Sequence, residues 1–373
     1  MTSKKIRAIG AAVLALIWVV LIVFSWVKPA DDISTAERRK LAQLPALNGE
    51  TLLSGSFMTD FEKYTTDQFP LRDTFRFIKA TFNNSVLQQM DNNDIYVANG
   101  YAAEMLYPLD EGSVKHALQT FNNVYDLFIK DKGCKVYVTV VPDKNYYLAE
   151  GSGHLRLDYE KMFSMMQTGI PESTYIDITG TLTIEDYYFT DTHWRQECLI
   201  PTAQVLCQAM GVTAPQESDY TPTAIEKPFY GVYHGQAALP LPAETMYIMN
   251  NNVLSGCRVK NYVAAGASVM EKMGKVYDMS KQGSMDLYDV FLSGTNALMR
   301  IENPKATTTK ELIVFRDSFG SSMTPLLLSD YAAVTLIDLR YVNDMGLLGQ
   351  KVDFAGKDVL FMPSSLVLNK NLL

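Results

Sequence analysis

The sequence is poor in the residues that bind metals or build disulfide frameworks. It has four histidines and four cysteines among 373 residues, and no two cysteines have the C-x-x-C spacing of a structural zinc site. We therefore expect no metal and no cofactor. The cysteines are Cys134, Cys198, Cys207 and Cys257. We expect buried free thiols, with a disulfide as the alternative if they lie outside the cytoplasm.

Basic residues are outnumbered by acidic ones. The chain has 33 Lys and Arg against 41 Asp and Glu, a net charge of −8. Residues 1–28 contribute +4 without any acid, so the remainder carries −12 (−8 minus 4). A surface of that sign repels phosphate backbones, so nucleic acid is not an expected partner. Internal repeats and low-complexity tracts are also lacking.

Long apolar runs are absent except for one near the N-terminus. Residues 8–27 contain no charge and would measure about 30 Å as a helix, the thickness of a bilayer's hydrocarbon core. Signal peptides have a shorter apolar region and a small-x-small cleavage site, so we favour an uncleaved, single-pass membrane anchor. Because Lys4, Lys5 and Arg7 precede the run, the N-terminus should be cytoplasmic and the chain after Lys28 extracytoplasmic.

The pattern along the chain predicts three regions. Residues 1–30 form the basic stub and anchor, and residues 31–92 form an aromatic-rich helical neck interrupted at Pro70. Residues 93–373 form one domain with a mixed, β-rich insertion at about 213–300. The neck is predicted from large apolar residues near helical spacing on both sides of the proline. They are Phe57, Phe61, Tyr64, Leu71, Phe75, Ile78 and Phe82.

Strands and helices alternate in the large domain. "CKVYVTVVP" (134–142) is a continuous apolar run, typical of a strand covered on both faces. The other expected elements are a hairpin at 94–106, helices at 111–133, 159–169, 195–211 and 321–332, and strands at 174–178, 310–315, 333–341 and from 358. Such alternation predicts an α/β fold with a mainly parallel sheet.

A candidate nucleophile stands where one strand gives way to a helix. "RDSFGSSMTP" (316–325) places Ser318 at the carboxyl edge of the sheet, where open α/β sheets bind ligands. The start of the helix offers unpaired backbone N–H groups that can stabilise an oxyanion. The alternative is that Ser318 or Asp317 only caps the helix.

Among the four histidines, His193 has an acid at a spacing that suits a catalytic base. It stands in "YYFTDTHWRQE", two residues after Asp191. A carboxylate there can hold one imidazole nitrogen while the other activates a serine hydroxyl. The alternative is a capping aspartate beside a packed histidine. The other histidines are His116, His154 and His234.

"FTDTHW" (189–194) and "FRDSFG" (315–320) together resemble the paired motifs of the DHHW family, which is related to the SGNH hydrolase-like domains of AlgX/AlgJ-type alginate O-acetyltransferases. Shorter resemblances in the same order, such as "FMTDFEKYTTDQFPLRDTFR" and "VVPDKNYY", extend it over roughly residues 31–373. The resemblance implies a three-layer, SGNH-hydrolase-like α/β domain with a mainly parallel sheet. It also implies a permuted order, in which the Asp-x-His motif precedes the serine.

Carried over to this chain, the resemblance implies that Ser318 is the nucleophile, His193 the base and Asp191 the residue that orients the base. Two positions depart from the family pattern. Arg316 stands where the alginate enzymes have glycine, and Thr192 stands where the family name has its first histidine.

Further residues are candidates for oxyanion or substrate contacts. They are Gly320, Lys144, Trp194, Asn296 and Asn369. For Lys144, a solvated side chain is the alternative. Asp338 and Arg340, in "IDLRY", are expected to form an ion pair at a strand end.

Together with these residues, the resemblance implies an O-acetyltransferase that modifies a cell-surface or exported polysaccharide through an acyl-serine intermediate. Coenzyme A thioesters stay in the cytoplasm, and one span cannot carry acetyl groups across a membrane. The resemblance to alginate acetylation therefore implies a multi-span membrane-bound O-acyltransferase as partner. The alternatives are a carbohydrate acetylesterase with the same pocket and a non-catalytic glycan-binding or scaffold subunit of a cell-envelope assembly.

Overall fold

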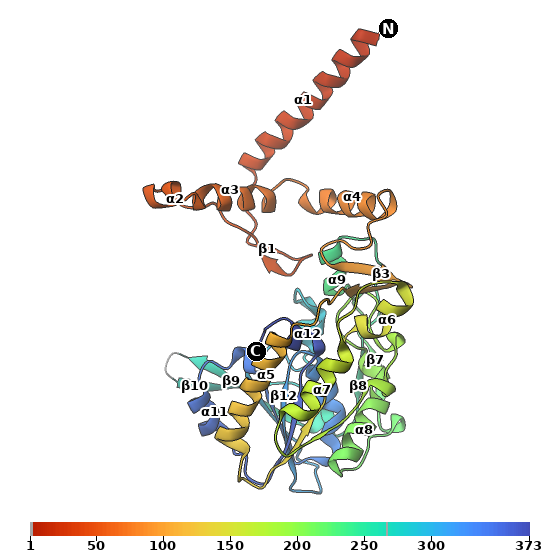
Figure 1. The fold of residues 1–373 in the computed structure, drawn as a ribbon, viewed down its shortest axis with the longest axis vertical. Helices are drawn as coiled ribbons and strands as arrows, with labels where there is room; N and C mark the ends of the chain where they lie inside the picture. The colour runs from red at the N-terminus through yellow and green to blue at the C-terminus, as the bar shows by residue number, and fades with distance from the viewer. Residues whose placement is uncertain (1–2, 266–267) are drawn as a thin grey trace. The chain divides into compact units, whose positions relative to one another are not determined.

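The computed structural model describes residues 3–265 and 268–373 (Figure 1). The chain divides into two compact units. The first contains the residues up to Asn92 together with His234–Pro240, and the second contains Asn93–Tyr233 and Leu241–Leu373. Nothing in the sequence pattern indicated that residues 234–240 belong with the first unit.

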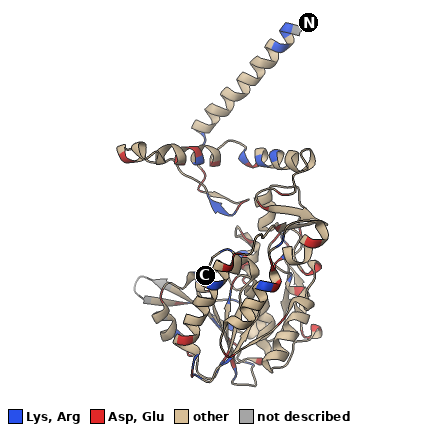
Figure 2. Cartoon of the chain, in the orientation of Figure 1, with Lys and Arg blue, Asp and Glu red and all other residues tan. Residues whose placement is uncertain are grey.

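The first unit begins with an apolar helix, α1 (Ser3–Val27). Its segment Lys4–Val27 is long and apolar enough to cross a membrane, and its basic side chains lie at the N-terminal end (Figure 2). Length and composition therefore fit a membrane anchor or a signal sequence.

The neck contains a small hairpin and three helices. Its elements are β1 (Ile33–Ser34), β2 (Arg39–Lys40), α2 (Gly49–Leu53), α3 (Ser56–Asp67) and α4 (Arg72–Ser85). The side chain of Asn48 caps α2 by accepting from the Thr51 N–H. Pro70 lies between α3 and α4, as expected for a residue that lacks the N–H of a helical hydrogen bond.

The second unit is built on a sheet of eight strands in the order β10-β9-β11-β13-β12-β14-β5-β6. The strands are β5 (Lys135–Val138), β6 (Ser173–Tyr175), β9 (Arg258–Ala265), β10 (Ser268–Gly274), β11 (Leu298–Glu302), β12 (Glu311–Arg316), β13 (Ala333–Ile337) and β14 (Asp358–Met362). The five from β13 to β6 are parallel, whereas β10, β9 and β11 pair antiparallel. The expected mainly parallel sheet is confirmed. The segment interpreted as an insertion extends this sheet at one edge.

Alternate side chains of the central strands enter two separate cores. In β12, Leu312 and Val314 pack into one core and Ile313 and Phe315 into the other, because successive strand residues point to opposite faces. Helices α8 (Ile200–Met210) and α10 (Phe319–Leu327) complete the first core. Helices α5 (Glu111–Val124) and α7 (Tyr159–Gly169) complete the second. The result is a three-layer α/β/α arrangement.

The remaining elements are short. They are β3 (Ile95–Ala98), β4 (Tyr101–Glu104), α6 (Lys144–Ser152), β7 (Thr221–Ala224), α9 (Val232–Ala237), β8 (Tyr247–Asn250), α11 (Met345–Lys351) and α12 (Ser365–Asn369). Short helical turns lie at Tyr125–Ile129, Thr179–Thr181, Ile184–Asp186, Gln196–Cys198, Glu217–Asp219, Leu254–Gly256, Met279–Gly283, Leu287–Val290, Leu328–Asp330 and Leu339–Tyr341.

Several expected elements are confirmed with changed bounds. The hairpin turns at Asn99 and Gly100, both with positive φ, as a two-residue turn requires. The helix expected at 195–211 begins only at Ile200, after a 3-10 turn. All four cysteines are free thiols, but only Cys207 is fully buried.

Candidate active site

Ser318 is the N-cap residue of α10, yet its side chain does not cap the helix. The neighbouring Asp317 takes that role, because its Oδ1 accepts the Phe319 N–H at 3.0 Å. Its Oδ2 accepts the Ser364 N–H at 2.7 Å, which ties the ends of β12 and β14 together. The capping alternative is therefore wrong for Ser318 and right for Asp317. The Ser318 hydroxyl stays partly exposed.

The structure brings Asp191, His193 and Ser318 into one chain of hydrogen bonds. The His193 Nε2 lies 2.7 Å from the Ser318 Oγ, and the His193 Nδ1 lies 2.6 Å from the Asp191 Oδ1. Asp191 is fully buried and His193 is 6% exposed. A proton on Nδ1 donates to the carboxylate and leaves the Nε2 lone pair facing the hydroxyl. This arrangement can remove the serine proton during nucleophilic attack.

A backbone segment that the sequence analysis missed holds Asp191 in place. The Val232 N–H donates to the Asp191 Oδ2 at 2.8 Å, and the Gly231 N–H donates to the Thr190 hydroxyl at 2.8 Å. A Cβ at Gly231 would lie 2.3 Å from the N and Cα of Asp191. Only glycine permits this approach, so the Gly in "GVYHGQ" was the signal available in the sequence.

Tyr288 packs flat against the proposed base and was also missed. Its ring stacks on the His193 imidazole at 3.8 Å between centroids and 8° between planes. Its hydroxyl donates to the Ser322 Oγ at 2.7 Å, and burial raises the pKa of Tyr288, so that the hydroxyl remains a donor. The stack and the hydrogen bond together restrict rotation of the imidazole.

Trp194 does not have the expected substrate contact. It is fully buried, and its indole N–H donates to the Ser322 Oγ at 2.9 Å and to the Phe319 carbonyl at 3.2 Å. Trp194 therefore ties the histidine loop to the first turn of α10. It adjoins His193 as expected, but as a packing residue.

Lys144 is neither solvated nor at a pocket rim. It is 2% exposed, and its ammonium donates to the carbonyls of Tyr188 at 2.8 Å and Phe189 at 3.2 Å. Burial lowers the pKa of Lys144 to about 7, while the carboxylates of Asp191, Glu244 and Asp143 act in the opposite direction. The lysine thus holds the segment that leads into Asp191.

Glu244 supports the same segment from another side. Its carboxylate accepts the backbone N–H groups of Phe189 and Thr190 and the Thr190 hydroxyl. Burial raises the pKa of Glu244. Lys144 therefore donates to carbonyl oxygens of this segment, and Glu244 accepts from its N–H groups. Both kinds of backbone group just before Asp191 thus have a side-chain partner.

Gly320 is not free to act as an oxyanion donor, contrary to expectation. Its N–H donates to the Asp317 carbonyl at 3.1 Å, inside the first turn of α10. A Cβ at Gly320 would lie 2.6 Å from the Arg316 Cβ, so glycine at this position makes room for the Arg316 side chain. Among the residues that the structure describes, no backbone acceptor is found for the Ser318 N–H, so this group is available to an oxyanion.

The two candidate asparagines bond to their own surroundings. Asn369 accepts the Asp110 N–H at 2.7 Å and donates to the Pro108 carbonyl at 3.1 Å. Asn296 donates to carbonyls within its own loop, with the Gly294 oxygen at 3.2 Å. Within residues 3–265 and 268–373, neither bonds to Ser318 or His193, and their contact with an oxyanion or a substrate stays a prediction.

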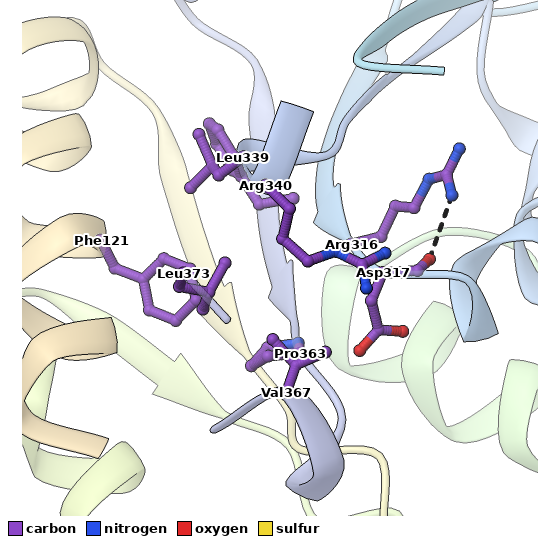
Figure 3. A pocket seen from close by; sticks show the side chains of 9 residues that line it. Phe121, Arg316, Asp317, Leu339, Arg340, Pro363, Val367 and Leu373 are labelled. Carbon is purple, nitrogen blue, oxygen red and sulfur yellow. Dashed lines mark hydrogen bonds between the residues drawn. The ribbon is translucent and has the colours of Figure 1, made fainter. Parts of the chain in front are cut away.

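The expected ion pair between Asp338 and Arg340 is confirmed. Arg340 donates from Nε and Nη2 to the two oxygens of Asp338, at 2.8 and 2.7 Å. A cavity of about 10 Å³ lies beside Arg340, Arg316 and Asp317 (Figure 3). That volume holds about one water molecule, and Ser318 is not among the residues that line the cavity. In the described ranges no group of three or more His, Cys, Asp or Glu could hold a metal ion.

Comparisons with known proteins place this geometry in a family. A family model described as DHHW protein matches residues 114–337, which include Asp191, His193 and Ser318. A solved DHHW family protein from Eubacterium siraeum is 17% identical and has a TM-score of 0.59, over 76% of this chain and 94% of that chain. At that identity the likeness shows a shared fold.

Two further solved structures are similar. Bacillus cereus PatB1 with a sulfonyl adduct is 17% identical and has a TM-score of 0.60, over 74% of this chain and 97% of that chain. The O-acetyltransferase domain of Pseudomonas putida AlgJ is 12% identical, over 74% and 92%, but its TM-score of 0.43 is too low to support an argument. No curated protein matches the chain.

Gly231→Ala should damage both stability and the Asp191 contact. The added methyl would meet the backbone of Asp191 at 2.3 Å, so one segment must move. We expect a loss of about 1–3 kcal/mol in the free energy of unfolding and slower turnover of an activated ester. Gly180→Ala is the control, since a Cβ there meets nothing within 4 Å. Equal stability and turnover in both variants would contradict this account of Asp191.

Lys144→Met should change how stability depends on pH. Burial holds the pKa of Lys144 at about 7 in the folded chain, whereas an unfolded lysine has a pKa of about 10.4. Between about pH 7 and about pH 10.4, Lys144 is therefore protonated in the unfolded chain and largely neutral in the folded chain. This lysine therefore makes the free energy of unfolding rise with pH above about 7. We expect chemical denaturation at several pH values to show that rise in the wild type and its loss in Lys144→Met. Replacing the exposed Lys115 by methionine is the control and should leave the rise in stability with pH unchanged. If Lys144→Met also keeps that rise, Lys144 is not the group that causes it.

Proposed function

The chain belongs to the DHHW family, and from this premise we propose that it is a membrane-anchored O-acetyltransferase of a cell-surface or exported polysaccharide. The observation that carries the proposal is the chain of hydrogen bonds from Asp191 through His193 to Ser318, with both links at 2.6–2.7 Å. The serine lies at the carboxyl edge of the parallel strands and at the start of a helix, where an oxyanion is stabilised.

The first half-reaction loads the serine. The Ser318 Oγ attacks the carbonyl carbon of an acetyl donor while the His193 Nε2 takes the hydroxyl proton. The Ser318 N–H donates to the oxyanion of the tetrahedral intermediate, and the partial positive charge at the start of α10 adds to this. When the intermediate collapses, the bond to the leaving group breaks and His193 returns the proton to that group. Acetyl-serine remains.

In the second half-reaction, the acetyl group is transferred from Ser318 to the sugar. A sugar hydroxyl attacks the acetyl carbon, and the His193 Nε2 takes the proton of that hydroxyl. The bond to the Ser318 Oγ breaks, and the proton passes to the serine. The Asp191 carboxylate accepts from the His193 Nδ1 and stabilises the imidazolium, and the hydrogen bond from the Val232 N–H holds its other oxygen.

We place the second unit outside the cytoplasm and α1 in the membrane, with the N-terminus inside. The lysines and arginine before the apolar run support this orientation. Since acetyl donors such as coenzyme A thioesters are cytoplasmic, the enzyme needs acetyl groups delivered across the bilayer. We propose a multi-span membrane-bound O-acyltransferase as the partner that supplies them.

Ser318→Ala should abolish labelling by a sulfonyl fluoride and lower ester turnover by ~10⁴-fold or more, because the nucleophile is lost. Asp191→Asn should keep the serine but slow both labelling and ester turnover by ~10⁴-fold, because the imidazole is no longer held in the tautomer with its proton on Nδ1. The measurements are mass spectrometry of the labelled peptide and p-nitrophenyl acetate kinetics. Ser255→Ala, at an exposed serine, is the control. Normal glycan acetylation in cells that carry Ser318→Ala would instead indicate a scaffold subunit.

Adding an acceptor oligosaccharide should separate transfer from hydrolysis. Both reactions share the acetyl-serine, and they differ in whether a sugar hydroxyl or water attacks it. We expect the oligosaccharide to speed release of p-nitrophenol and to become acetylated, as detected by mass spectrometry. Release of acetate at an unchanged rate, with no acetylated sugar, would make the chain an esterase.

A further inference from the structure

Helix α4 of the neck carries an apolar stripe on its exposed face. The stripe consists of Leu71, at the helix N-cap, and Phe75, Ile78 and Phe82, which are 64%, 45%, 54% and 51% exposed. Their spacing of four, three and four residues places all four side chains on one side of the helix. Large apolar side chains gathered in this way mark an interaction site on a soluble surface.

The opposite face of α4 carries the charges. Arg72 and Arg76 pair with Glu37. Arg76 also donates to the carbonyls of Gly235 and Gln236, at 3.0 and 3.1 Å. The helix therefore turns its arginines inward and its phenylalanines outward. An ordinary surface helix has the reverse pattern, so this one is built for apolar surroundings on its outer side.

Hydrogen bonds tie the end of α3, just before α4, to the chain that leaves α1. The Asp31 N–H donates to the Gln68 Oε1 at 2.9 Å, and the Gln68 Nε2 donates to the Asp31 carbonyl at 2.8 Å. Asp31 stands four residues after Val27, the last residue of α1. Four residues span at most about 14 Å, so the junction before α4 is held within that distance of the end of the apolar helix.

We propose that the stripe of α4 lies in the headgroup region of the bilayer that α1 spans, so that α4 is an interfacial helix. The ligand is a phospholipid surface. A helix with phenylalanine and leucine on one face and basic residues on the other suits that environment, and the exposed Lys79 beside the stripe can reach lipid phosphates. The proposal rests on the membrane anchor in the proposed function.

Quenching of tryptophan fluorescence by brominated lipid tests the proposal. The full chain is reconstituted in vesicles of phosphatidylethanolamine and phosphatidylglycerol whose acyl chains carry bromine close to the headgroup. Trp18 and Trp26 are replaced by phenylalanine, and Ile78→Trp adds a reporter in the stripe. Trp194 is buried in the second unit and supplies a constant background. We expect the emission of the new tryptophan to shift to the blue and to lose most of its intensity.

Asn84→Trp in the same background is the matched control, because Asn84 is an exposed residue of α4 on the side away from the stripe. Its emission should keep its intensity. The chain with its native Trp18 and Trp26 reports on the anchor separately. If those two are quenched and the Ile78→Trp reporter is not, the interfacial helix is wrong and the anchor stands.

Two other outcomes also count against the proposal. A blue shift without quenching at position 78 would indicate that protein covers the stripe, either a second copy of the chain or a membrane partner. An absence of quenching of native Trp18 and Trp26 would remove the anchor, and with it both this inference and the proposed topology. The reactivity of Ser318 toward a sulfonyl fluoride is independent of both.

Discussion

The hydrogen bonds of Asp317 determine what Ser318 can do. A serine at the start of a helix normally satisfies a backbone N–H of the first turn. Here the preceding carboxylate accepts that N–H and also the N–H of Ser364 from the neighbouring strand end. The hydroxyl is therefore released from a structural role and lies 2.7 Å from His193. The Phe319 N–H keeps an acceptor, because the cap moves by one residue to Asp317.

The base is held by an environment that differs on each side. Its Nδ1 meets a buried carboxylate, its ring face meets Tyr288, and its backbone segment is bonded by Lys144 and Glu244. Buried polar groups are costly unless each finds a partner, and here each partner belongs to a different part of the chain. Rigid support of this kind keeps a proton acceptor aligned with its donor, which is what nucleophilic catalysis needs.

The neck and the second unit differ in where their apolar side chains lie. In the neck, Arg72 and Arg76 turn inward to Glu37 and leave apolar side chains outside, whereas the second unit buries apolar side chains on both faces of its large sheet. This difference is the one that the proposed interfacial position of α4 requires, because one face of an interfacial helix meets lipid. An acetyltransferase that receives acetyl groups at the membrane would gain from such a neck, because it keeps the domain near the supply.

The sequence by itself determined the apolar helix and the alternation of strands and helices, because these depend on local spacing. The pairing of the D-x-H segment with a serine at a strand end was implied by the resemblance of the two motifs to the DHHW family. The sequence also predicted the ion pair of Asp338 and Arg340, two residues apart. Tertiary structure alone decided that Asp317 rather than Ser318 caps α10, that Gly231 holds Asp191, and that Tyr288 stacks on His193. It also decided that Trp194, Lys144 and Asn369 form hydrogen bonds with other parts of the protein. Apart from the cap by Asp317, these contacts join residues far apart along the chain, and hydrogen-bond partners at that distance leave no periodic mark in a sequence.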